Sequence, residues 1–295
     1  MLGRVEKTVA RYQMVRPGDL VLAAVSGGKD SASLLHLLSR LREKLGFRLK
    51  GLHIDLGIGE YSKRCRKAAE ALSEALKIPA LTIDLEELGI PIPKLAKYSR
   101  KGMCSICGTV KRYLMNFSAL AVGAASVATG HILDDAVHLA LKVFLTSEPS
   151  QLAVLRPAVE RFEGLAVAKI KPLIEVSGKE SLTYALVNRL PFYHGECPYH
   201  DERFINVGLR EFQDKLEDEH PGIKLSFIRR FNKLLTMLPQ ADVQLRNVRK
   251  CTVCGMISQT EKCAFCRLVE RALGDAEKLN YRLKEMLASS PLKAA

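Results

Sequence analysis

Long apolar runs and tryptophan are both missing from this 295-residue chain. No uninterrupted apolar stretch approaches the roughly 20 residues of a membrane helix, so we expect no membrane association. The N-terminal stretch MLGRVEKTVARYQMVRPGD is charged throughout and lacks the apolar segment of a signal peptide. The lack of tryptophan excludes nothing by itself. With 47% apolar residues, the composition predicts a cytoplasmic globular protein.

Acidic residues are also fewer than basic ones. The chain has 32 Asp and Glu and 45 Lys and Arg, which give a formal net charge of +13. A positive field of this size attracts polyanions such as nucleic acids. A generally basic surface with no particular partner explains the charge equally well. Charge alone therefore leaves the partner open.

Buried apolar runs alternate with helical patterns through the first two thirds of the chain. We expect strands over residues 19–26, 47–55, 80–85 and 125–131, and helices over 27–46, 61–76, 114–124, 132–146 and 178–189. Parallel neighbouring strands need a crossover of a dozen or more residues, usually a helix. The pattern predicts an α/β fold with a doubly wound parallel sheet, whose ligands bind beyond the carboxyl ends of the strands.

The sequence pattern changes after residue 198. The stretch 199–240 looks helical and basic, a compact cysteine cluster follows, and 268–288 has the pattern of a charged helix. We expect an N-terminal helix over 1–17, a sheet domain over 18–198, a helical region over 199–247, a cysteine module over 248–268, and a final helix with its tail over 269–295.

A glycine-rich loop, SGGKDS, runs from Ser26 to Ser31 between a predicted strand and a predicted helix. Gly27 and Gly28 let backbone N–H groups turn toward a phosphate, and Lys29 adds a positive charge at the start of the helix. The loop is shorter than the G-x-x-x-x-G-K-[ST] loop of ordinary nucleoside triphosphatases. A turn that merely contains these residues is the alternative, but this strand-to-helix context favours a phosphate site.

Two later stretches place polar residues at the carboxyl ends of predicted strands. His53 and Asp55 end the second strand, and the GHILDD segment contributes Gly130, His131 and the pair Asp134 and Asp135. A carboxylate here could hold Mg²⁺, which prefers oxygen ligands. Without further information, His53 and Asp55 are equally well explained as polar groups with local partners.

Six of the eight cysteines fall in three C-x-x-C pairs, a pattern that in a cytosolic chain indicates metal or redox chemistry. The spacing C-x₂-C-x₈-C-x₂-C predicts a closed tetrahedral zinc site, with the ligands Cys251, Cys254, Cys263 and Cys266. Basic residues on either side, in RNVRK and at Arg267, suggest a role in positioning RNA, or else a solvated rim.

The remaining pair, Cys104 and Cys107, has one further candidate partner, Cys197 in HGECP. Three thiolates are one short of a closed four-cysteine site, and they suit a 4Fe-4S cluster that leaves one iron without a protein ligand. A dithiol redox pair and a three-cysteine zinc site remain open from the residues alone. Cys65 lies in a predicted helix without a partner pattern, and we interpret it as an ordinary helix residue.

These motifs together resemble a known family. SGGKDS resembles the PP-loop of the N-type ATP pyrophosphatases, which cleave ATP between the α and β phosphates. Along the chain come, in this order, SGGKDS, GIGEYSKR, CSICGTVKRY, GHILDD, HGECP and the C-terminal cysteines. This set of motifs closely resembles that of the tRNA 2-thiouridine synthetases that thiolate the T-loop, and that of their relatives that thiolate the wobble uridine. The resemblance extends from about Gly18 to Arg267.

The resemblance implies an adenine nucleotide α-hydrolase-like PP-loop fold over 18–198 and an ATP-dependent tRNA sulfurtransferase that adenylates a uridine at its C2 oxygen. It implies a ubiquitin-like sulfur carrier protein as donor, tRNA contacts over 199–247 and a homodimer. The site residues it implies are Ser26, Gly27, Gly28, Lys29, Asp30, Ser31, His53, Asp55, Gly130 and His131 for ATP with Mg²⁺, Cys104, Cys107 and Cys197 for a 4Fe-4S cluster, and Lys111 and Asp135 as catalytic residues.

The chain also departs from the family pattern, since no cysteine precedes Gly18 where relatives usually carry a second zinc module. The choice of uridine could therefore differ. A tRNA 2-thiocytidine synthetase is the nearest alternative enzyme, although the C-terminal cysteines and GEYS argue against it. A non-catalytic, zinc-stabilised tRNA-binding protein is the alternative of another class, and the complete SGGKDS loop argues against that.

Overall fold

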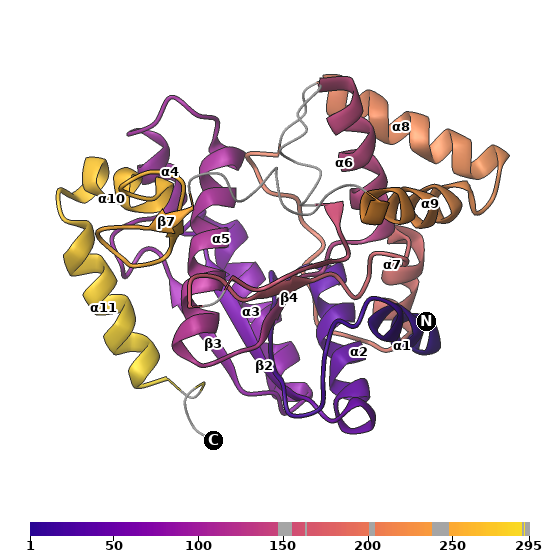
Figure 1. The fold of residues 1–295 in the computed structure, drawn as a ribbon, viewed down its shortest axis with the longest axis horizontal. Helices are drawn as coiled ribbons and strands as arrows, with labels where there is room; N and C mark the ends of the chain where they lie inside the picture. Colours follow the sequence, from indigo (N-terminus) through magenta and orange to yellow (C-terminus); the bar gives the residue numbers. More distant parts are fainter. Residues whose placement is uncertain (147–154, 163, 201–203, 238–247, 291, 293–295) are drawn as a thin grey trace.

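A six-stranded sheet forms the centre of the protein in the computed structural model, which describes residues 1–146, 155–162, 164–200, 204–237, 248–290 and 292 (Figure 1). The strands are β1 (Leu20–Ala24), β2 (Arg48–Asp55), β3 (Ala80–Asp84), β4 (Ser126–Ala128), β5 (Ala158–Val159) and β6 (Ala168–Ile170), in the spatial order β3-β2-β1-β4-β6-β5. Two short strands, β7 (Arg249–Lys250) and β8 (Ile257–Ser258), form a separate antiparallel pair.

The helices of the described residues alternate with the strands over most of the chain. They are α1 (Leu2–Arg11), α2 (Lys29–Leu45), α3 (Gly59–Ala75), α4 (Ile92–Ala96), α5 (Met103–Ala121), α6 (Leu133–Thr146), α7 (Gly178–Val187), α8 (Phe204–Glu219), α9 (Ile223–Met237), α10 (Ala264–Leu273) and α11 (Ala276–Ala288). None of these helices is long and apolar enough to cross a membrane.

The sheet is doubly wound, as the sequence predicts. From β1 the chain moves outward through β2 and β3, and it then returns to the other side of β1 with β4. All strand pairs are parallel except β5 with β6, so an antiparallel strand closes one edge. The direction of winding switches between β1 and β4, and the carboxyl ends of these two strands are where such folds bind ligands.

Alternate residues of β1 enter two different cores, as expected for a strand covered on both faces. Leu20 and Leu22 pack in the cluster that includes α5, α10 and α11. Val21 and Ala23 pack in the cluster that includes α1, α2 and α7. The near-continuous apolar run in the sequence follows from this two-sided burial.

Three helix boundaries differ from the sequence-based expectation. Helix α5 begins at Met103, eleven residues before the predicted start, so the first C-x-x-C pair lies within it. The predicted helix 268–288 is two helices, because Gly274 has φ 80° and ends α10, and Asp275 caps α11. Helix α1 ends at Arg11, short of residue 17.

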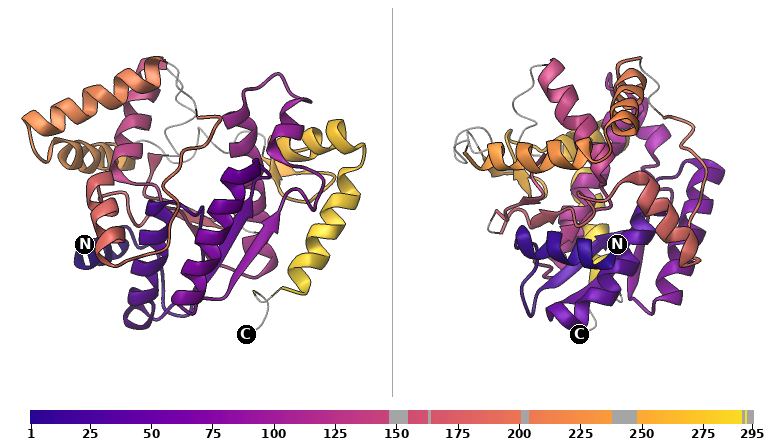
Figure 2. Two further views of the ribbon diagram at one scale, coloured as in Figure 1. Left: turned by 180° about the vertical axis from the view of Figure 1, so that it is seen from behind. Right: turned by 90° about the vertical axis from the view of Figure 1, so that its right-hand side faces the viewer.

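The predicted helical region 199–247 contains α8 and α9, while residues 201–203 and 238–247 lie outside the described part. Both helices lie beside α6, on the opposite side of the molecule from α10 and α11 (Figures 1 and 2). The expected basic character holds for α9 but is wrong for α8, whose sequence FINVGLREFQDKLEDE has more acidic than basic residues.

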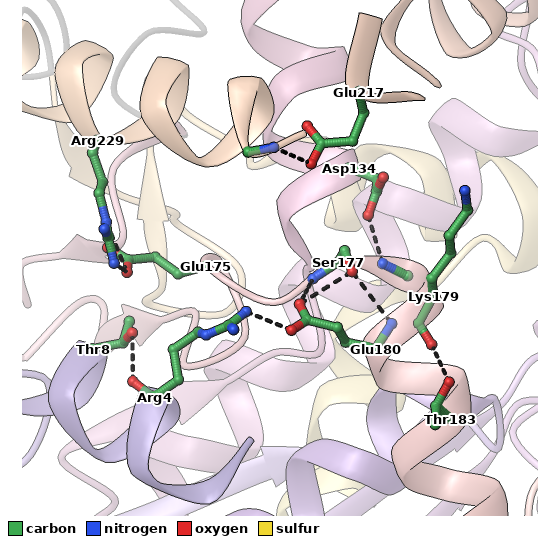
Figure 3. Close-up of polar contacts among 12 residues, drawn as sticks. Arg4, Thr8, Asp134, Glu175, Ser177, Lys179, Glu180, Thr183, Glu217 and Arg229 are labelled. Atoms are coloured by element: carbon green, nitrogen blue, oxygen red, sulfur yellow. Dashed lines mark hydrogen bonds and ion pairs between the residues drawn. The ribbon is translucent and has the colours of Figure 1, made fainter. Parts of the chain in front are cut away.

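A buried carboxylate, Glu175, ties α1 and α9 to the segment after β6, and Figure 3 shows its contact with Arg229 of α9. Its side chain is 1% exposed. Its two oxygens accept from Arg11, at 2.5 Å, and from Arg229, at 2.6 Å. Burial alone would raise the pKa of Glu175, but the hydrogen bonds and charges of Arg229 and Arg11 outweigh it and hold the pKa below its ordinary value.

We expect Glu175→Gln to destabilise the protein by about 2 kcal/mol at pH 7, because charge-assisted hydrogen bonds are lost in a buried position. Since the pKa of Glu175 is depressed in the folded state, its contribution is complete above the unfolded pKa and is lost as the pH falls through the lower folded pKa. Urea denaturation at several pH values should show wild type and variant converging below about pH 4.

The matched control is Glu6→Gln, which breaks an ion pair with Lys44 at the surface. This variant should cost less than about 1 kcal/mol. An equal loss in both variants would contradict the special role of Glu175.

Candidate functional site

The SGGKDS loop leaves β1 and leads into α2, as the sequence predicts. Ser31 braces the loop, because its hydroxyl donates to the Gly28 carbonyl oxygen at 2.9 Å and accepts from the Ser26 backbone N–H at 3.1 Å. The ammonium of Lys29 lies 2.7 Å from an Asp30 carboxylate oxygen. The loop thus places the N-terminus of a 17-residue helix and a lysine at one point, an arrangement that favours anion binding.

Gly27 is required by the geometry of this loop. Its φ is 87°, and a Cβ added there would lie 2.4 Å from the backbone oxygen of Cys65. A side chain would therefore be strained and would also force the start of α2 away from α3. The first glycine of SGGKDS is what allows the loop to pack against α3.

The segment after β4 packs directly on the loop. A Cβ at Gly130 would lie 3.0 Å from the backbone nitrogen of Ser31, so only glycine allows this approach without displacement. His131 follows on the wall of a cavity, where its ring contacts the Thr129 hydroxyl at 2.8 Å. Its ring is open to the cavity but enclosed by protein on most sides, and this enclosure together with the charges of Lys171 and Lys111 lowers its pKa to about 4.

The cavity beside the loop has a volume of about 730 Å³, within the size range of small-molecule sites. Its walls come from the starts of α2, α6 and α7 and from α8 and α9. The lining residues include Lys29, Asp30, His131, Asp134, Asp135, Gly178, Arg210, Gln213 and Lys224. The structure therefore brings the GHILDD segment and the SGGKDS loop to a common wall.

Asp134 and Asp135 differ in what they contact. Asp134 accepts from the backbone N–H of Gly178 and from Lys224, both at 2.6 Å, so it joins α6 to α7 and α9. Asp135 accepts only from the Ile132 backbone N–H, at 3.2 Å, within the described residues. Enclosure by protein raises the pKa of Asp135, and the charges of Asp30 and Asp134 act in the same direction. Within the described residues, Asp135 thus has fewer hydrogen-bond partners than Asp134.

His53 and Asp55 have local partners at the end of β2. His53 is 4% exposed, and its Nδ1 lies 2.7 Å from the Val25 carbonyl oxygen while its Nε2 has no hydrogen-bond partner in the described structure. Burial lowers the pKa of His53 despite the hydrogen bond to Val25, so the ring is neutral near pH 7. Asp55 accepts from the Gly57 backbone N–H at 3.0 Å. Both residues therefore support the loops at the sheet edge.

A second, smaller cavity of about 100 Å³ lies between the loop and α5. Ser26 and His53 line one side, and Lys111 lies on the other. Cys65 and Tyr61 of α3 complete the wall. The catalytic candidate Lys111 therefore faces the same small space as the glycine-rich loop.

Cys104, Cys107 and Lys111 share one face of α5, because residues three, four and seven positions apart align on a helix. The Cys104 thiol donates to the Tyr199 carbonyl oxygen at 3.2 Å, which holds the segment with Cys197 near the start of α5. Burial raises the pKa of Cys107, the nearby Lys111 lowers it, and Cys197 and Cys104 raise it. All three predicted ligands are therefore near one another.

The four C-terminal cysteines form a closer group. Their sulfur atoms lie within 4.8 Å of one another, all four residues are buried, and the Cys254 and Cys263 sulfurs are 3.9 Å apart. A tetrahedral ion with bonds near 2.3 Å to sulfur needs neighbouring sulfurs about 3.8 Å apart. The cluster could therefore bind a metal ion. In the described part of the chain no other set of three or more Cys, His, Asp or Glu residues gathers in this way.

The cysteine cluster is joined to the main body through α5. The ring of Tyr113 stacks on that of Phe265, with centroids 3.8 Å apart, and both lie in one apolar core with the four cysteines. Backbone and side-chain N–H groups point at the sulfurs, from Cys263 to Cys251 at 3.2 Å and from Asn280 to Cys266 at 3.7 Å. Such N–H contacts stabilise thiolates and orient metal ligands.

Sequence reasoning missed two features near the site. The start of α7 carries a capping box between Ser177 and Glu180, and its backbone brings Gly178 to Asp134 (Figure 3). Its signal was visible in S-G-K-E, an S-x-x-E pattern. Lys224 is buried between Asp134 and Asp214, and no local pattern marks that long-range contact.

Comparisons with known proteins agree with this geometry. A family profile described as a PP-loop domain matches residues 1–211. The tRNA-5-methyluridine(54) 2-sulfurtransferase of Thermus thermophilus is 38% identical over 275 residues, which cover 92% of this chain and 83% of the relative. The protein of the same name from Pyrococcus horikoshii is 33% identical over 265 residues, covering 90% of this chain and 83% of the relative.

A solved structure is also similar to this fold. It is the U34-tRNA thiolase NcsA from Methanococcus maripaludis with its 4Fe-4S cluster, with a TM-score of 0.76 and 25% sequence identity. The match covers 91% of this chain and 86% of that chain.

We expect the purified protein to hold about one metal ion in the C-terminal cluster, since four thiolates close a tetrahedral site. Cys263→Ser should lose that ion and lower the thermal unfolding midpoint by at least roughly 5 °C, because metal binding and folding are coupled. Cys65→Ala is the control, since this buried cysteine lies outside the cluster and should keep the ion. Elemental analysis decides the point, and an unchanged metal content in Cys263→Ser would contradict the assignment.

Proposed function

The chain belongs to the PP-loop family, among its tRNA 2-sulfurtransferases, and from this premise we propose that it is an ATP-dependent enzyme that converts a tRNA uridine to 2-thiouridine. The observation that carries the proposal is the position of Lys111. It faces the cavity beside the SGGKDS loop and is also close enough to Cys107 to influence its pKa. A nucleotide site and a sulfur-handling site thus adjoin at one sheet edge.

In the first step, the C2 oxygen of the uridine attacks the α phosphorus of ATP, and pyrophosphate leaves. The N–H groups of the loop and the ammonium of Lys29 stabilise the negative charge that builds up on pyrophosphate. Mg²⁺ would be held by carboxylate oxygens in the larger cavity, which Asp30 lines. Gly130, His131, His53 and Asp55 would shape the nucleotide site around the loop.

In the second step, the sulfur of a hydrosulfide attacks C2, and AMP leaves with the former uridine oxygen. Lys111 would place its positive charge beside the oxygen that gains charge during both steps. Asp135, with its raised pKa, would accept the proton released as sulfur bonds to C2. Asp135 lines the larger cavity and Lys111 lines the smaller one.

Cys104, Cys107 and Cys197 fit a 4Fe-4S cluster better than a single ion. They lie near one another, yet in the described structure they do not form a group tight enough for one tetrahedral metal. A cluster held by these cysteines would supply an iron without a protein ligand, which would act as a Lewis acid for the sulfur. The four C-terminal cysteines, in contrast, fit a structural Zn²⁺.

We further propose the T-loop uridine at position 54 as the target, the position named for the relatives from Thermus and Pyrococcus. The wobble uridine is the second candidate, because the similar solved structure is named a U34-tRNA thiolase. In this proposal a ubiquitin-like carrier delivers the sulfur, the protein acts in the cytoplasm as a homodimer, and residues 199–247 face the tRNA. Residues 18–198 form the catalytic PP-loop domain and 248–268 the zinc module.

Two variants test the nucleotide site and the three-cysteine site separately. Lys29→Ala should reduce tRNA-dependent pyrophosphate release at least about 100-fold while keeping the iron, because it removes charge stabilisation from the leaving group. Cys197→Ala should lose iron and thiolation but still bind ATP. Iron content and pyrophosphate release, measured anaerobically, test both, and Lys7→Ala at the surface of α1 is the control. Thiolation that survives Lys29→Ala, or iron that survives Cys197→Ala, would contradict the proposal.

Mass spectrometry of tRNA nucleosides from cells without the protein identifies the target. Loss of 2-thiolated 5-methyluridine supports position 54, and loss of a wobble thiouridine supports the second candidate.

A further inference from the structure

Four cations form a connected group between the cysteine pair and the segment after β4. Lys111 and Arg112 come from α5, Lys169 from β6, and Lys171 directly follows β6. We call this group the cation strip. None of these residues belongs to the SGGKDS loop, and Arg112, Lys169 and Lys171 have no role in the steps above.

Lys169, the lysine of the strip that lies in β6, faces α5. Residues two apart in an extended chain share a face, and Val167 and Lys169 follow that spacing. Val167 packs in the apolar cluster that contains α5, and its backbone N–H donates to Asn116 of α5 at 3.1 Å. Lys171 is 9% exposed, and its ammonium donates to the Arg156 carbonyl oxygen at 3.0 Å.

Arg112 lies next to the cysteine pair. A Cβ at Gly108 would lie 2.9 Å from Nη1 of Arg112, so the guanidinium packs over Gly108, the residue after Cys107. Enclosure by protein lowers the pKa of Arg112, and the charge of a Cys107 thiolate acts in the opposite direction.

The members of the strip repel one another. Burial lowers the pKa of Lys169, and the charge of Arg112 lowers it further. Burial and the charge of Lys169 lower the pKa of Lys171 to about 8. In the described part of the chain no carboxylate forms an ion pair with Lys111, Arg112 or Lys169. Lys111 and Arg112 are exposed and Lys169 is half-buried, so an anion from solution can reach these three cations.

We propose that the cation strip is a phosphate site for an RNA strand, where Arg112 and Lys169 hold a phosphodiester next to the nucleotide being modified. This rests on the proposed function. The phosphates of ATP already have the SGGKDS loop, the start of α2 and Lys29. The cation strip instead begins beside Cys107 and ends at Lys171, whose charge contributes to the lowered pKa of His131. A uridine that must reach both ATP and sulfur would place the neighbouring phosphates of the RNA along the cation strip.

The test measures binding of unmodified tRNA transcript to the full-length purified protein at several salt concentrations. Arg112→Gln and Lys169→Gln should each weaken binding and reduce the slope of log affinity against log salt by about one, as expected for the loss of one phosphate contact. ATP affinity and iron content should stay as in wild type. Lys7→Gln, which removes an exposed charge from α1, is the matched control and should leave the slope unchanged.

Each outcome decides a separate point. Slopes that match Lys7→Gln overturn the RNA site, and a weakened ATP affinity with normal tRNA slopes assigns the strip to nucleotide phosphates instead. Loss of iron in Arg112→Gln assigns Arg112 to the cysteine site and overturns its role here. A wild-type protein that does not bind tRNA contradicts the proposed function itself, before any variant is compared.

Discussion

The close contact between the segment after β4 and the start of α2 is the constraint on which the candidate site depends. Gly130 allows the two backbones to approach, because a Cβ would lie 3.0 Å from the Ser31 nitrogen. This contact forms at the point where the winding of the sheet reverses, so the chain diverges on both sides and leaves the carboxyl edge open. The positions of His131 and Asp135 relative to the SGGKDS loop follow from it.

Helix α5 connects the other parts of the molecule to this edge. Its first turns carry Cys104 and Cys107, and the following turn carries Lys111 and Arg112. Further along, Tyr113 stacks on Phe265 of the C-terminal cysteine cluster. A metal in that cluster would therefore stabilise the helix that also positions the cysteine pair. The family to which the chain belongs would be expected to need such rigidity, since a sulfur atom must be presented to a tRNA base.

Charge is distributed unevenly around the edge. Carboxylates such as Asp134 and Glu175 are paired with buried or half-buried cations and hold α1, α7 and α9 in place. The cations of α5 and β6, in contrast, face one another without carboxylate partners in the described residues. The first arrangement is typical of structural ion pairs. The second leaves positive charge uncompensated among these residues, and such charge attracts anions.

The sequence by itself determined the alternation of strands and helices, the SGGKDS loop and the four-cysteine cluster, because each depends on local spacing: apolar periodicity, glycines between strand and helix, and paired C-x-x-C motifs. It did not determine where α5 begins, since Cys, Ser and Gly in its first turns are weak helix formers. Nor could it show that Lys224 reaches Asp134 or that Lys169 faces Arg112. Those contacts join residues 90 and 57 positions apart, and only packing of the helices on the sheet brings them together.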